Sequence, residues 1–287
     1  MTPELERAIA DNVTAALEED LGSGDLTAAL IDADTVVGAT IVARESIVVA
    51  GQPWVDEVFS RIDPEIVVDW YIGDGGTADA DDVVCKLVGD ARHLLSGERT
   101  ALNFLQTLSA TATAAAEWVG AVRGTRATIL DTRKTIPGLR QAQKYAVRIG
   151  GASNHRTGLF DAILIKENHI RAAGSIAEAL KAANASVESG DGGVLIAIEV
   201  ESLGELREAL DAGASRILLD NFSVDDLKAA VEINAGYGDV AAELEASGNV
   251  TLDNVREIAE TGVDYVSTGA LTKNVKAADL SMLLTIG

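Results

Sequence analysis

From residue 127 onward, short apolar runs alternate with segments whose apolar positions recur at helical spacing. Several helical segments end at a glycine, the usual closing residue, as at Gly213, Gly236 and Gly262. Alternating strands and helices predict a parallel sheet with right-handed crossovers. Six runs that are apolar enough to be buried on both faces favour an incomplete TIM-like barrel over an open sheet. These runs are 127–131, 162–166, 194–200, 216–220, 240–246 and 263–269, with helices between them at 203–213, 224–236 and 252–262.

The first 112 residues follow a different pattern, in which strands and helices do not alternate regularly. Helices are predicted at 3–19, 53–61 and 95–119, and β segments at 36–51, 65–71 and 82–88. We therefore expect an α/β protein with an N-terminal α/β sandwich domain at 1–112 and an α/β-barrel domain at 113–274. A terminal helix is predicted at 275–287, and it could pack on the sandwich domain.

Composition narrows the class of protein. Hydrophobic residues make up 47% of the chain, which is enough for a large core. The single cysteine, Cys85, excludes an intramolecular disulfide framework and is typical of a reducing cytoplasm. The N-terminal segment lacks the basic start of a signal peptide, and no run of about 18 apolar residues predicts a membrane span. A soluble cytoplasmic protein is expected.

Acidic residues dominate the charge. Asp and Glu number 45 against 23 Lys and Arg, and the formal net charge is −22. This balance argues against nucleic acid as a partner. Because salt screens the repulsion between surface carboxylates, an acidic and lysine-poor surface suggests a halophilic source. A stability that does not change between low and molar salt would contradict this hypothesis.

One stretch departs from this balance, and we call it the basic island. Between Arg99 and Arg171, eleven Lys or Arg stand against four acids, which gives +7 in a chain of −22. A chain that is poor in cations elsewhere is expected to use such a cluster to hold an anion. The cations are Arg99, Arg123, Arg126, Arg133, Lys134, Arg140, Lys144, Arg148, Arg156, Lys166 and Arg171.

Candidate site residues follow the apolar runs, because parallel barrels carry their working groups at the carboxyl ends of strands. Arg133 and Arg156 can grip carboxylate or phosphate oxygens in pairs, and lysines add compact positive charge. Glu199 and Asp220 suit ribose hydroxyls, a Mg²⁺ ion carrying a diphosphate, or a developing cation. The polar residues at or near these strand ends include Thr132, Arg133, Lys134, His155, Arg156, Lys166, Glu199 and Asp220.

Two small-residue turns follow the last two runs. Ser247-Gly248 and Thr268-Gly269 are expected to open onto helices, where free backbone N–H groups favour a phosphate. A phosphate site after the last two strands recurs in this type of barrel. With the residue before each turn, these strand ends comprise Ala246, Ser247, Gly248, Ser267, Thr268 and Gly269.

Structural roles compete with these functional ones. Glu199 and Asp220 could form structural salt bridges with the nearby cations. We expect Asp131, Glu201 and Glu245 to orient neighbours or to lie in the barrel wall. A second set recurs at helical spacing, and a solvated or interface helix face is favoured for it: Arg140, Lys144 and Arg148.

The segment DTRKTIPGLRQAQKYAVRIGGASNHRTGLFDAILIKENHI (131–170) resembles the quinolinate phosphoribosyltransferase family. The resemblance extends over almost the whole chain. The departures are small: Ala152 stands where a third glycine is common, and Glu167 where Asp is often found. Further matching motifs are EDLGSGDLT (19–27), SGERTALNFLQTLSATAT (96–113), IEVES (198–202), ILLDNF (217–222), LEASGNV (244–250) and STGALT (267–272).

The resemblance implies a homodimer with shared active sites and a requirement for Mg²⁺. Whether dimers assemble further is left open. The family transfers the phosphoribosyl group of phosphoribosyl pyrophosphate to quinolinate, and it releases diphosphate and CO₂ as nicotinate mononucleotide forms. Arg133, Lys134, His155, Arg156 and Lys166 would bind quinolinate and nearby phosphates. Arg99 would reach into the partner's site, Glu199 and Asp220 would contact the ribose and its metal, and the two turns would hold the 5′-phosphate. The residues expected to act in the chemistry are Lys134, Lys166, Glu199 and Asp220.

Three alternatives stay open at this point. A phosphoribosyltransferase of the same fold could act on another base. An aldolase could use Lys166 as a Schiff base, which borohydride trapping with a carbonyl substrate would reveal. A non-catalytic anion-binding protein would show no turnover, and it would have little use for carboxylates beside a cationic pocket.

Overall fold

The computed structural model describes residues 1–33, 35–188 and 193–285. The chain divides into two compact units, named here for their architecture. The predicted domain boundary after residue 112 lies within one continuous helix, α3 (Ala91–Ala121). The sandwich unit comprises Met1–Ala116, Thr135–Gly151 and Leu271–Gly287, and the barrel unit comprises Glu117–Lys134 and Ala152–Ala270.

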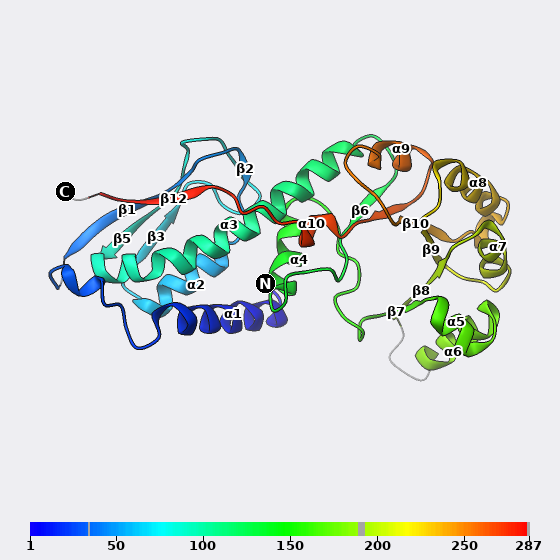
Figure 1. Ribbon diagram of the computed structural model, residues 1–287, viewed down its shortest axis with the longest axis horizontal. Coiled ribbons are helices and arrows are strands. Elements are labelled where there is room, and N and C mark those ends of the chain that lie inside the picture. Colours follow the sequence, from blue (N-terminus) through cyan, green and yellow to red (C-terminus); the bar gives the residue numbers. More distant parts are fainter. Residues whose placement is uncertain (34, 189–192, 286–287) are drawn as a thin grey trace. The chain divides into compact units, whose positions relative to one another are not determined.

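The sandwich unit is built on an antiparallel sheet of four strands in the order β12-β1-β5-β3. Helices cover one face of this sheet (Figure 1), so the unit has two layers. Its strands are β1 (Val36–Ala43), β3 (Val67–Trp70), β5 (Val83–Asp90) and β12 (Leu280–Thr285), with a small pair formed by β2 (Ile47–Val48) and β4 (Thr77–Ala78). Its helices are α1 (Pro3–Leu21), α2 (Gln52–Ile62), most of α3, and α4 (Arg140–Ile149), with a 3₁₀ turn, η1 (Ala28–Leu30).

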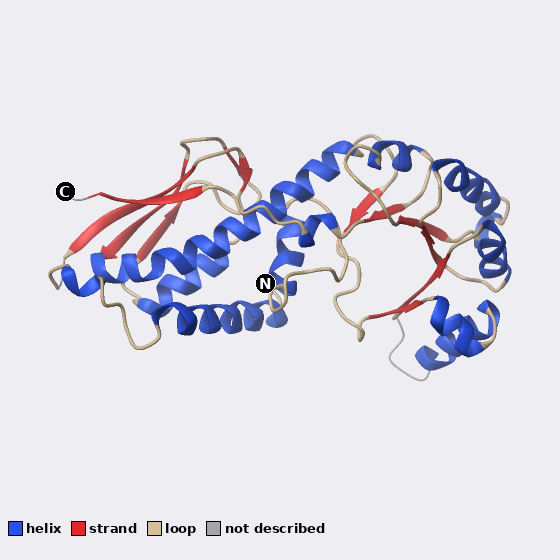
Figure 2. Cartoon of the chain, viewed as in Figure 1, coloured by secondary structure: helices blue, strands red, loops and turns tan. Residues whose placement is uncertain are grey.

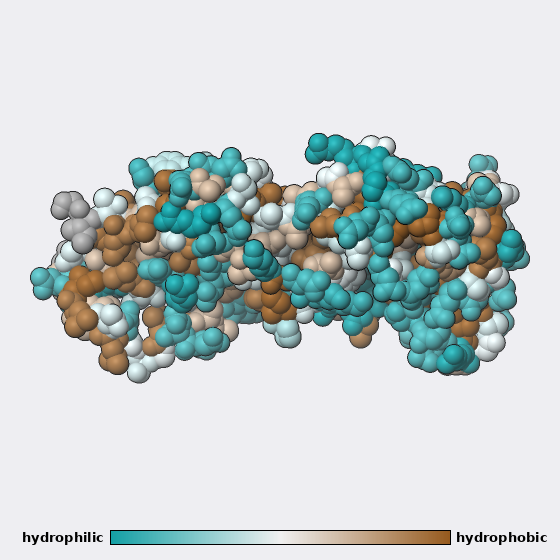
Figure 3. Space-filling model, turned by 45° about the horizontal axis from the view of Figure 1, so that its top comes forward, coloured by the Kyte–Doolittle hydropathy of each residue, from teal (hydrophilic) through white to brown (hydrophobic). Residues whose placement is uncertain are grey.

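The core of the sandwich unit follows the alternation of side chains along each strand. Ile41 and Leu87 face the helices and are fully buried against Trp54, Phe59 and Leu105. The opposite face of the sheet carries exposed apolar side chains, and brown, apolar surface gathers over this unit in Figure 3. The exposed apolar residues of these strands are Val36, Val67, Val88 and Leu283.

The terminal helix predicted at 275–287 is wrong. Residues Leu280–Thr285 form strand β12, which pairs with β1 from Ala43↔Leu280 to Gly38↔Thr285. Leu280 and Met282 are buried, whereas Leu283 is 46% exposed. The free edge of β1 supplies hydrogen-bond partners, and the alternating side chains suit a strand with one buried face.

The barrel unit contains a parallel sheet of six strands in the order β6-β11-β10-β9-β8-β7. The strands curve inside an arc of helices (Figure 2), which confirms the predicted incomplete barrel. The strands are β6 (Thr128–Leu130), β7 (Ala162–Ile165), β8 (Leu195–Val200), β9 (Arg216–Asp220), β10 (Glu243–Ser247) and β11 (Tyr265–Ser267). The helices include α5 (Glu167–Ala173), α6 (Ile176–Glu188), α7 (Leu203–Asp211), α8 (Val224–Ala235) and α9 (Val255–Glu260); η2 (Gly238–Val240) is a 3₁₀ turn, and α10 (Ala270–Lys273) begins at the end of this unit.

Alternation along the parallel strands determines what fills the barrel. Glu199, Leu218, Glu245 and Tyr265 are neighbours in one register row, so their side chains lie on the same side of the sheet. Apolar residues of the other parity, such as Leu219, are fully buried. The interior row is therefore unusually polar, and the polar groups lie below the strand ends where a ligand would bind. None of the helices in the described residues combines the length and apolarity that a membrane span requires.

Candidate functional site

A cavity of about 220 Å³ lies at the carboxyl ends of the barrel strands. The side chains that line it come from β7 and the residue that follows it, from β8, β9, β10 and β11, from the loop after β6 and from the loop between α4 and β7. Parallel strands bring these ends to one rim, as the barrel architecture requires. The lining residues are Thr132, Arg133, Lys134, His155, Arg156, Leu164, Lys166, Glu199, Leu218, Glu245, Ser247 and Ser267.

Nine of the predicted site residues line this cavity, and the others lie apart from its wall. Ala246 is buried on the helix side of β10, as its parity requires. Asp220 is the register neighbour of Ser247, one strand away. Arg99 is an exposed residue of α3 in the sandwich unit. The remaining predicted residues that do not line the cavity are Gly248, Thr268 and Gly269.

One wall of the cavity is cationic. Arg133 and Arg156 both line it, and the buried Asp131 holds the segment that carries Arg156. The carboxylate of Asp131 accepts hydrogen bonds from Asn154 Nδ2 and from the His155 backbone N–H, each at 2.8 Å. The predicted orienting role of Asp131 agrees with these contacts.

Arg133 and Arg156 repel each other. Burial lowers the pKa of the Arg156 guanidinium below its usual value, and the positive charge of Arg133 lowers it further. An anion placed between the two guanidinium groups would relieve this repulsion. The wall is therefore suited to a carboxylate or phosphate group.

Another part of the cavity lining pairs a cation with a carboxylate. Lys166 Nζ lies 2.5 Å from Glu199 Oε2, and Glu199 is the more buried partner. The sequence analysis gave a structural salt bridge with a nearby cation as the alternative role of Glu199, and this contact is such a salt bridge. Its lysine side chain remains 43% exposed, so the pair lies at the cavity surface, where a ligand can reach it.

Asp220 does not line the cavity, but it interacts electrostatically with the Lys166–Glu199 pair. Burial raises the pKa of the Asp220 carboxyl, and the negative charge of Glu199 raises it further, against the opposing effect of Lys166. Two carboxylates and one ammonium group thus interact electrostatically. A ligand with hydroxyl groups or a bound cation would stabilise both carboxylates in their charged forms.

The turn after β10 adopts a backbone that requires glycine. Gly248 has φ +90°, and a Cβ there would lie 2.2 Å from Asn221 Oδ1. Asn221 itself is left-handed, at φ 57°, and its N–H donates to the Ser247 carbonyl at 2.9 Å. The predicted helix follows this turn as α9, which begins at Val255, so that residues 249–254 separate it from Gly248.

The turn after β11 does open onto a helix, α10, although that helix has only four residues. A Cβ on Gly269 would lie 2.9 Å from the side chain of Lys134. Glycine at this position therefore leaves room for the Lys134 side chain at the edge of the cavity. Thr132 Oγ1 accepts a hydrogen bond from the Lys134 backbone N–H at 3.1 Å and so orders the same loop.

Part of the basic island lies outside the cavity. Arg140, Lys144 and Arg148 belong to α4 in the sandwich unit. Arg148 is exposed, as expected, but Lys144 is only 1% exposed. The predicted solvated or interface helix face is therefore wrong for Lys144, which is buried within its own chain.

Sequence reasoning missed two apolar residues and one cation of this region. Leu164 and Leu218 line the cavity and could have been identified from the alternation along their strands. Arg216 lies beneath the cavity, where it contacts the buried Glu245. Its position as a charged residue at the start of an apolar run was the only signal in the sequence.

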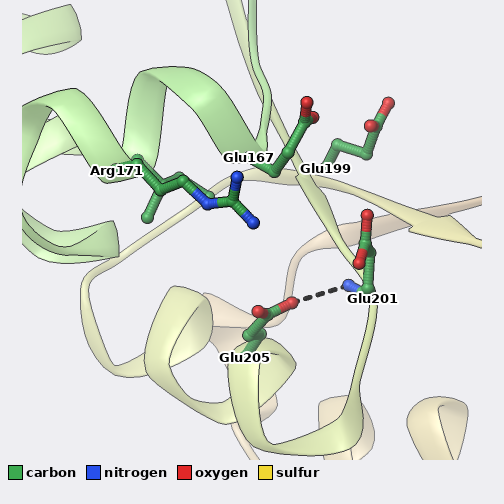
Figure 4. Close-up of a pocket in the computed structure, with 6 residues that line it drawn as sticks. Glu167, Arg171, Glu199, Glu201 and Glu205 are labelled. Carbon is green, nitrogen blue, oxygen red and sulfur yellow. Dashed lines mark hydrogen bonds between the residues drawn. The ribbon is translucent and has the colours of Figure 1, made fainter.

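A smaller acidic pocket adjoins the cavity and shares Glu199 with it (Figure 4). Its volume is about 130 Å³. Arg171 extends toward the carboxylates, and the Glu201 backbone N–H donates to Glu205 Oε2 at 2.7 Å. The full lining is Glu167, Ile170, Arg171, Glu199, Glu201 and Glu205.

The described residues contain no group of three or more His, Cys, Asp or Glu side chains placed to hold a metal ion. Glu199 and Asp220 are nevertheless hard oxygen donors. Mg²⁺ commonly binds through one or two carboxylates together with the phosphates of a substrate. The residues therefore fit a Mg²⁺ ion that arrives with a phosphorylated ligand, rather than one held by the protein alone.

Family models match most of the chain. The model described as Quinolinate phosphoribosyl transferase, C-terminal domain, matches residues 111–283. The model of the N-terminal domain of the same family matches residues 25–109.

Individual relatives agree with the family models. Nicotinate-nucleotide pyrophosphorylase (carboxylating) from Mycobacterium leprae is 42% identical over 285 residues, which cover 96% of both chains. The Nicotiana tabacum protein named quinolinate phosphoribosyltransferase (decarboxylating) 2b, mitochondrial, is 41% identical over 93% of this chain and 79% of its own length. The solved structure of the nicotinate-nucleotide pyrophosphorylase from Francisella tularensis superposes with a TM-score of 0.93, at 42% identity and with 99% of this chain and 98% of that chain covered. This chain therefore belongs to the quinolinate phosphoribosyltransferase family.

Proposed function

We propose that this protein transfers the phosphoribosyl group of phosphoribosyl pyrophosphate to quinolinate. The products would be nicotinate mononucleotide, diphosphate and CO₂, which makes the reaction a step of NAD biosynthesis. The observation that carries the proposal is one cavity whose lining combines Arg133 and Arg156 with the Lys166–Glu199 pair. A dicarboxylate and a phosphorylated sugar need this combination of charges.

Each group of site residues is assigned to one part of the two substrates. Arg133 and Arg156, with His155 beside them, hold the carboxylates of quinolinate. Lys134 and Lys166 neutralise nearby phosphate oxygens, and Glu199 and Asp220 contact the ribose hydroxyls. The 5′-phosphate is held by the two turns, through Ala246, Ser247 and Gly248 and through Ser267, Thr268 and Gly269.

The chemistry needs no covalent enzyme intermediate. As the bond from the ribose C1 to the diphosphate breaks, positive charge develops on the sugar ring, and a carboxylate such as Glu199 stabilises it. The quinolinate nitrogen then supplies the electron pair for the new bond to C1. As CO₂ leaves, the adjacent ring carbon keeps the electron pair of the broken bond, the positive charge of the alkylated ring nitrogen stabilises that pair, and the carbon then takes up a proton.

Mg²⁺ would bind with the diphosphate, beside Glu199 and Asp220. Its contribution is to neutralise the negative charge that accumulates on the departing diphosphate. The protein's own part is to hold the two substrates in line and to exclude water from the cavity.

A homodimer with shared active sites is also proposed, in which Arg99 of the partner subunit completes each cavity. Arg99 is exposed on α3 and is not among the described residues that line its own chain's cavity. The exposed apolar face formed by Val36, Val67, Val88 and Leu283 supports association, since such patches are usually covered. Assembly beyond the dimer is compatible with the same surface.

We also propose a cytoplasmic location and adaptation to high salt. The single cysteine, Cys85, is buried and suits a reducing compartment. The net charge of −22 would give a stability and an activity that increase with salt concentration, because salt screens the repulsion between carboxylates.

The test is incubation of the purified protein with quinolinate, phosphoribosyl pyrophosphate and Mg²⁺ at low and at molar salt. Nicotinate mononucleotide and CO₂ should form in equal amounts, and chelation of Mg²⁺ by EDTA should stop the reaction. Arg133→Ala should mainly raise the KM for quinolinate. Absence of both products under all salt conditions would refute the proposal, and turnover with another base in place of quinolinate would identify the same-fold alternative.

A further inference from the structure

A buried ionic cluster lies beneath the cavity. Arg216 donates to Glu245 Oε2 from Nη2 at 2.9 Å and from Nε at 3.3 Å, and its Nη1 donates to Glu243 at 3.0 Å. The Arg216 guanidinium also lies 3.5 Å from the centre of the Tyr265 ring. Contacts with β10 and β11 therefore hold Arg216 in place, and both of its hydrogen bonds to Glu245 are accepted by one oxygen, Oε2.

Glu245 connects this cluster to the cavity. Its side chain lines the cavity and is fully buried, and its Oε1 atom lies 3.5 Å from His155 Nε2. Burial favours a raised pKa for the Glu245 carboxyl, but contacts with His155, Ser267 and Arg216 outweigh it and hold the pKa below the usual value. Within the described residues, Oε1 has no partner at hydrogen-bond distance. This atom is thus an acceptor that points toward the histidine.

The other side of the His155 ring is also occupied. His155 Nδ1 accepts a hydrogen bond from the Arg156 backbone N–H at 2.7 Å. A backbone N–H can only donate, so Nδ1 carries no hydrogen, and the ring hydrogen lies on Nε2, facing Glu245. Both ring nitrogens of His155 are directed at the protein. The ring consequently meets a ligand through its carbon edge and not as a hydrogen-bond donor.

We propose that Glu245 is a positioning residue, which Arg216 holds in place and which fixes the His155 ring in the Nε2–H tautomer. Since the same ring accepts the Arg156 backbone N–H, the tautomer determines where the Arg156 guanidinium enters the cavity. His155 then acts by holding Arg156 in place, whereas the sequence assigned it direct binding of the substrate. The inference rests on the proposed function only for the identity of the anion that Arg156 binds.

The tautomer can be measured without any turnover. The chain contains only three histidines, His93, His155 and His169, so ¹⁵N-histidine spectra are simple, and the His155→Ala variant identifies the His155 signals. In the wild-type protein, Nδ1 of His155 should show the shift of a nitrogen without hydrogen, and Nε2 that of a protonated one. The Glu245→Gln variant should lose this signature, because its amide can donate to Nε2 and favour the opposite tautomer.

Steady-state kinetics provides the second readout. Glu245→Gln should raise the KM for quinolinate about 10-fold or more, since a small displacement of a binding group is costly. The kcat and the KM for phosphoribosyl pyrophosphate should change much less. The double variant His155→Ala/Glu245→Gln should be no worse than His155→Ala alone, because Glu245 acts through His155.

Glu243→Gln is the matched control. Glu243 also pairs with Arg216, at 3.0 Å, but its side chain is 54% exposed and does not line the cavity. This variant should keep the quinolinate KM and the His155 tautomer of the wild-type protein. If Glu245→Gln does not fold because Arg216 is left unpaired, the double variant Arg216→Met/Glu245→Met removes both charges, and it should show the same rise in KM.

Three results would overturn the proposal: a wild-type His155 with its hydrogen on Nδ1, a quinolinate KM in a folded Glu245 variant equal to that of Glu243→Gln, or additive effects in the double variant with His155→Ala. If the wild-type protein shows no turnover, the proposed function fails. The tautomer measurement would then still decide whether Glu245 positions His155.

Discussion

At the scale of single residues, the site follows from a rule about position more than from residue type. Arg133, Lys166 and Glu199 could be predicted because parallel strands end at one rim, and each of them lies at or just after the end of a strand. Arg156 lies in the loop between α4 and β7 and was found from the charge of that loop. Lys144 could not be predicted in this way. Helical spacing identifies a helix face but not what covers it, and the covering elements are distant in sequence.

Cys85 provides a test of burial at a single residue. Burial raises the pKa of its thiol to about 12, and its side chain has no solvent exposure. At pH 8 only about one thiol in ten thousand would be the reactive thiolate. The native protein should therefore react with a thiol reagent at least about 100-fold more slowly than the unfolded protein. Equal rates with and without denaturant, followed by absorbance, would contradict the described packing of β5.

At the scale of elements, the strands of the barrel unit could be predicted from the sequence, whereas strand β12 at the end of the chain could not. The apolar runs between residues 127 and 269 all became strands, since buried parallel strands need nearly continuous apolar sequence. A short apolar run such as that within residues 275–287 suits either a helix or a strand, and the helix predicted there is wrong. Pairing with β1 decided the outcome, and that partner lies more than 230 residues earlier in the chain.

Strand β12 offers a test of this alternation with adjacent residues. Met282 is 9% exposed and faces the helices, whereas Leu283 is 46% exposed on the other face. Met282→Ala should lower the free energy of unfolding by about 2–4 kcal/mol, through lost burial and the cavity left behind. Leu283→Ala should lower it by less than about 1 kcal/mol. Denaturant unfolding of both variants measures the difference, and equal losses would be inconsistent with the strand.

At the scale of the whole molecule, the chain builds two units from interleaved segments. Thr135–Gly151 and Leu271–Gly287 belong to the sandwich unit, although barrel segments separate them from its first part. The cavity residues, by contrast, all belong to the barrel unit. Under the proposed dimer, each barrel would need only Arg99 from the partner subunit, so an active site would combine two chains.

Shared sites can be tested by mixing inactive variants. Arg99→Ala and Lys134→Ala should each abolish most activity as homodimers. A dimer with one chain of each kind has one intact site, so random pairing should restore roughly a quarter of the sites. Co-expression with different affinity tags allows the mixed dimers to be isolated, and in these about half of the sites should be active.

The matched control is the pair Lys134→Ala and Lys166→Ala. Both residues line the same cavity of one chain, so every site in their mixed dimer keeps one defect. No activity should return in that mixture. Recovery there, or none with the Arg99 variant, would rule out the proposed sharing.

The pairing of β12 with β1 also constrains the order in which the two units can fold during translation. The barrel unit lies within residues 117–270, so its strands can associate before the last residues emerge from the ribosome. The sheet of the sandwich unit cannot close until residue 285 has been synthesised, because Gly38 pairs with Thr285. Until then, β1 presents an unpaired edge, which makes the early chain vulnerable to edge-to-edge aggregation. The end of the chain thus protects its beginning.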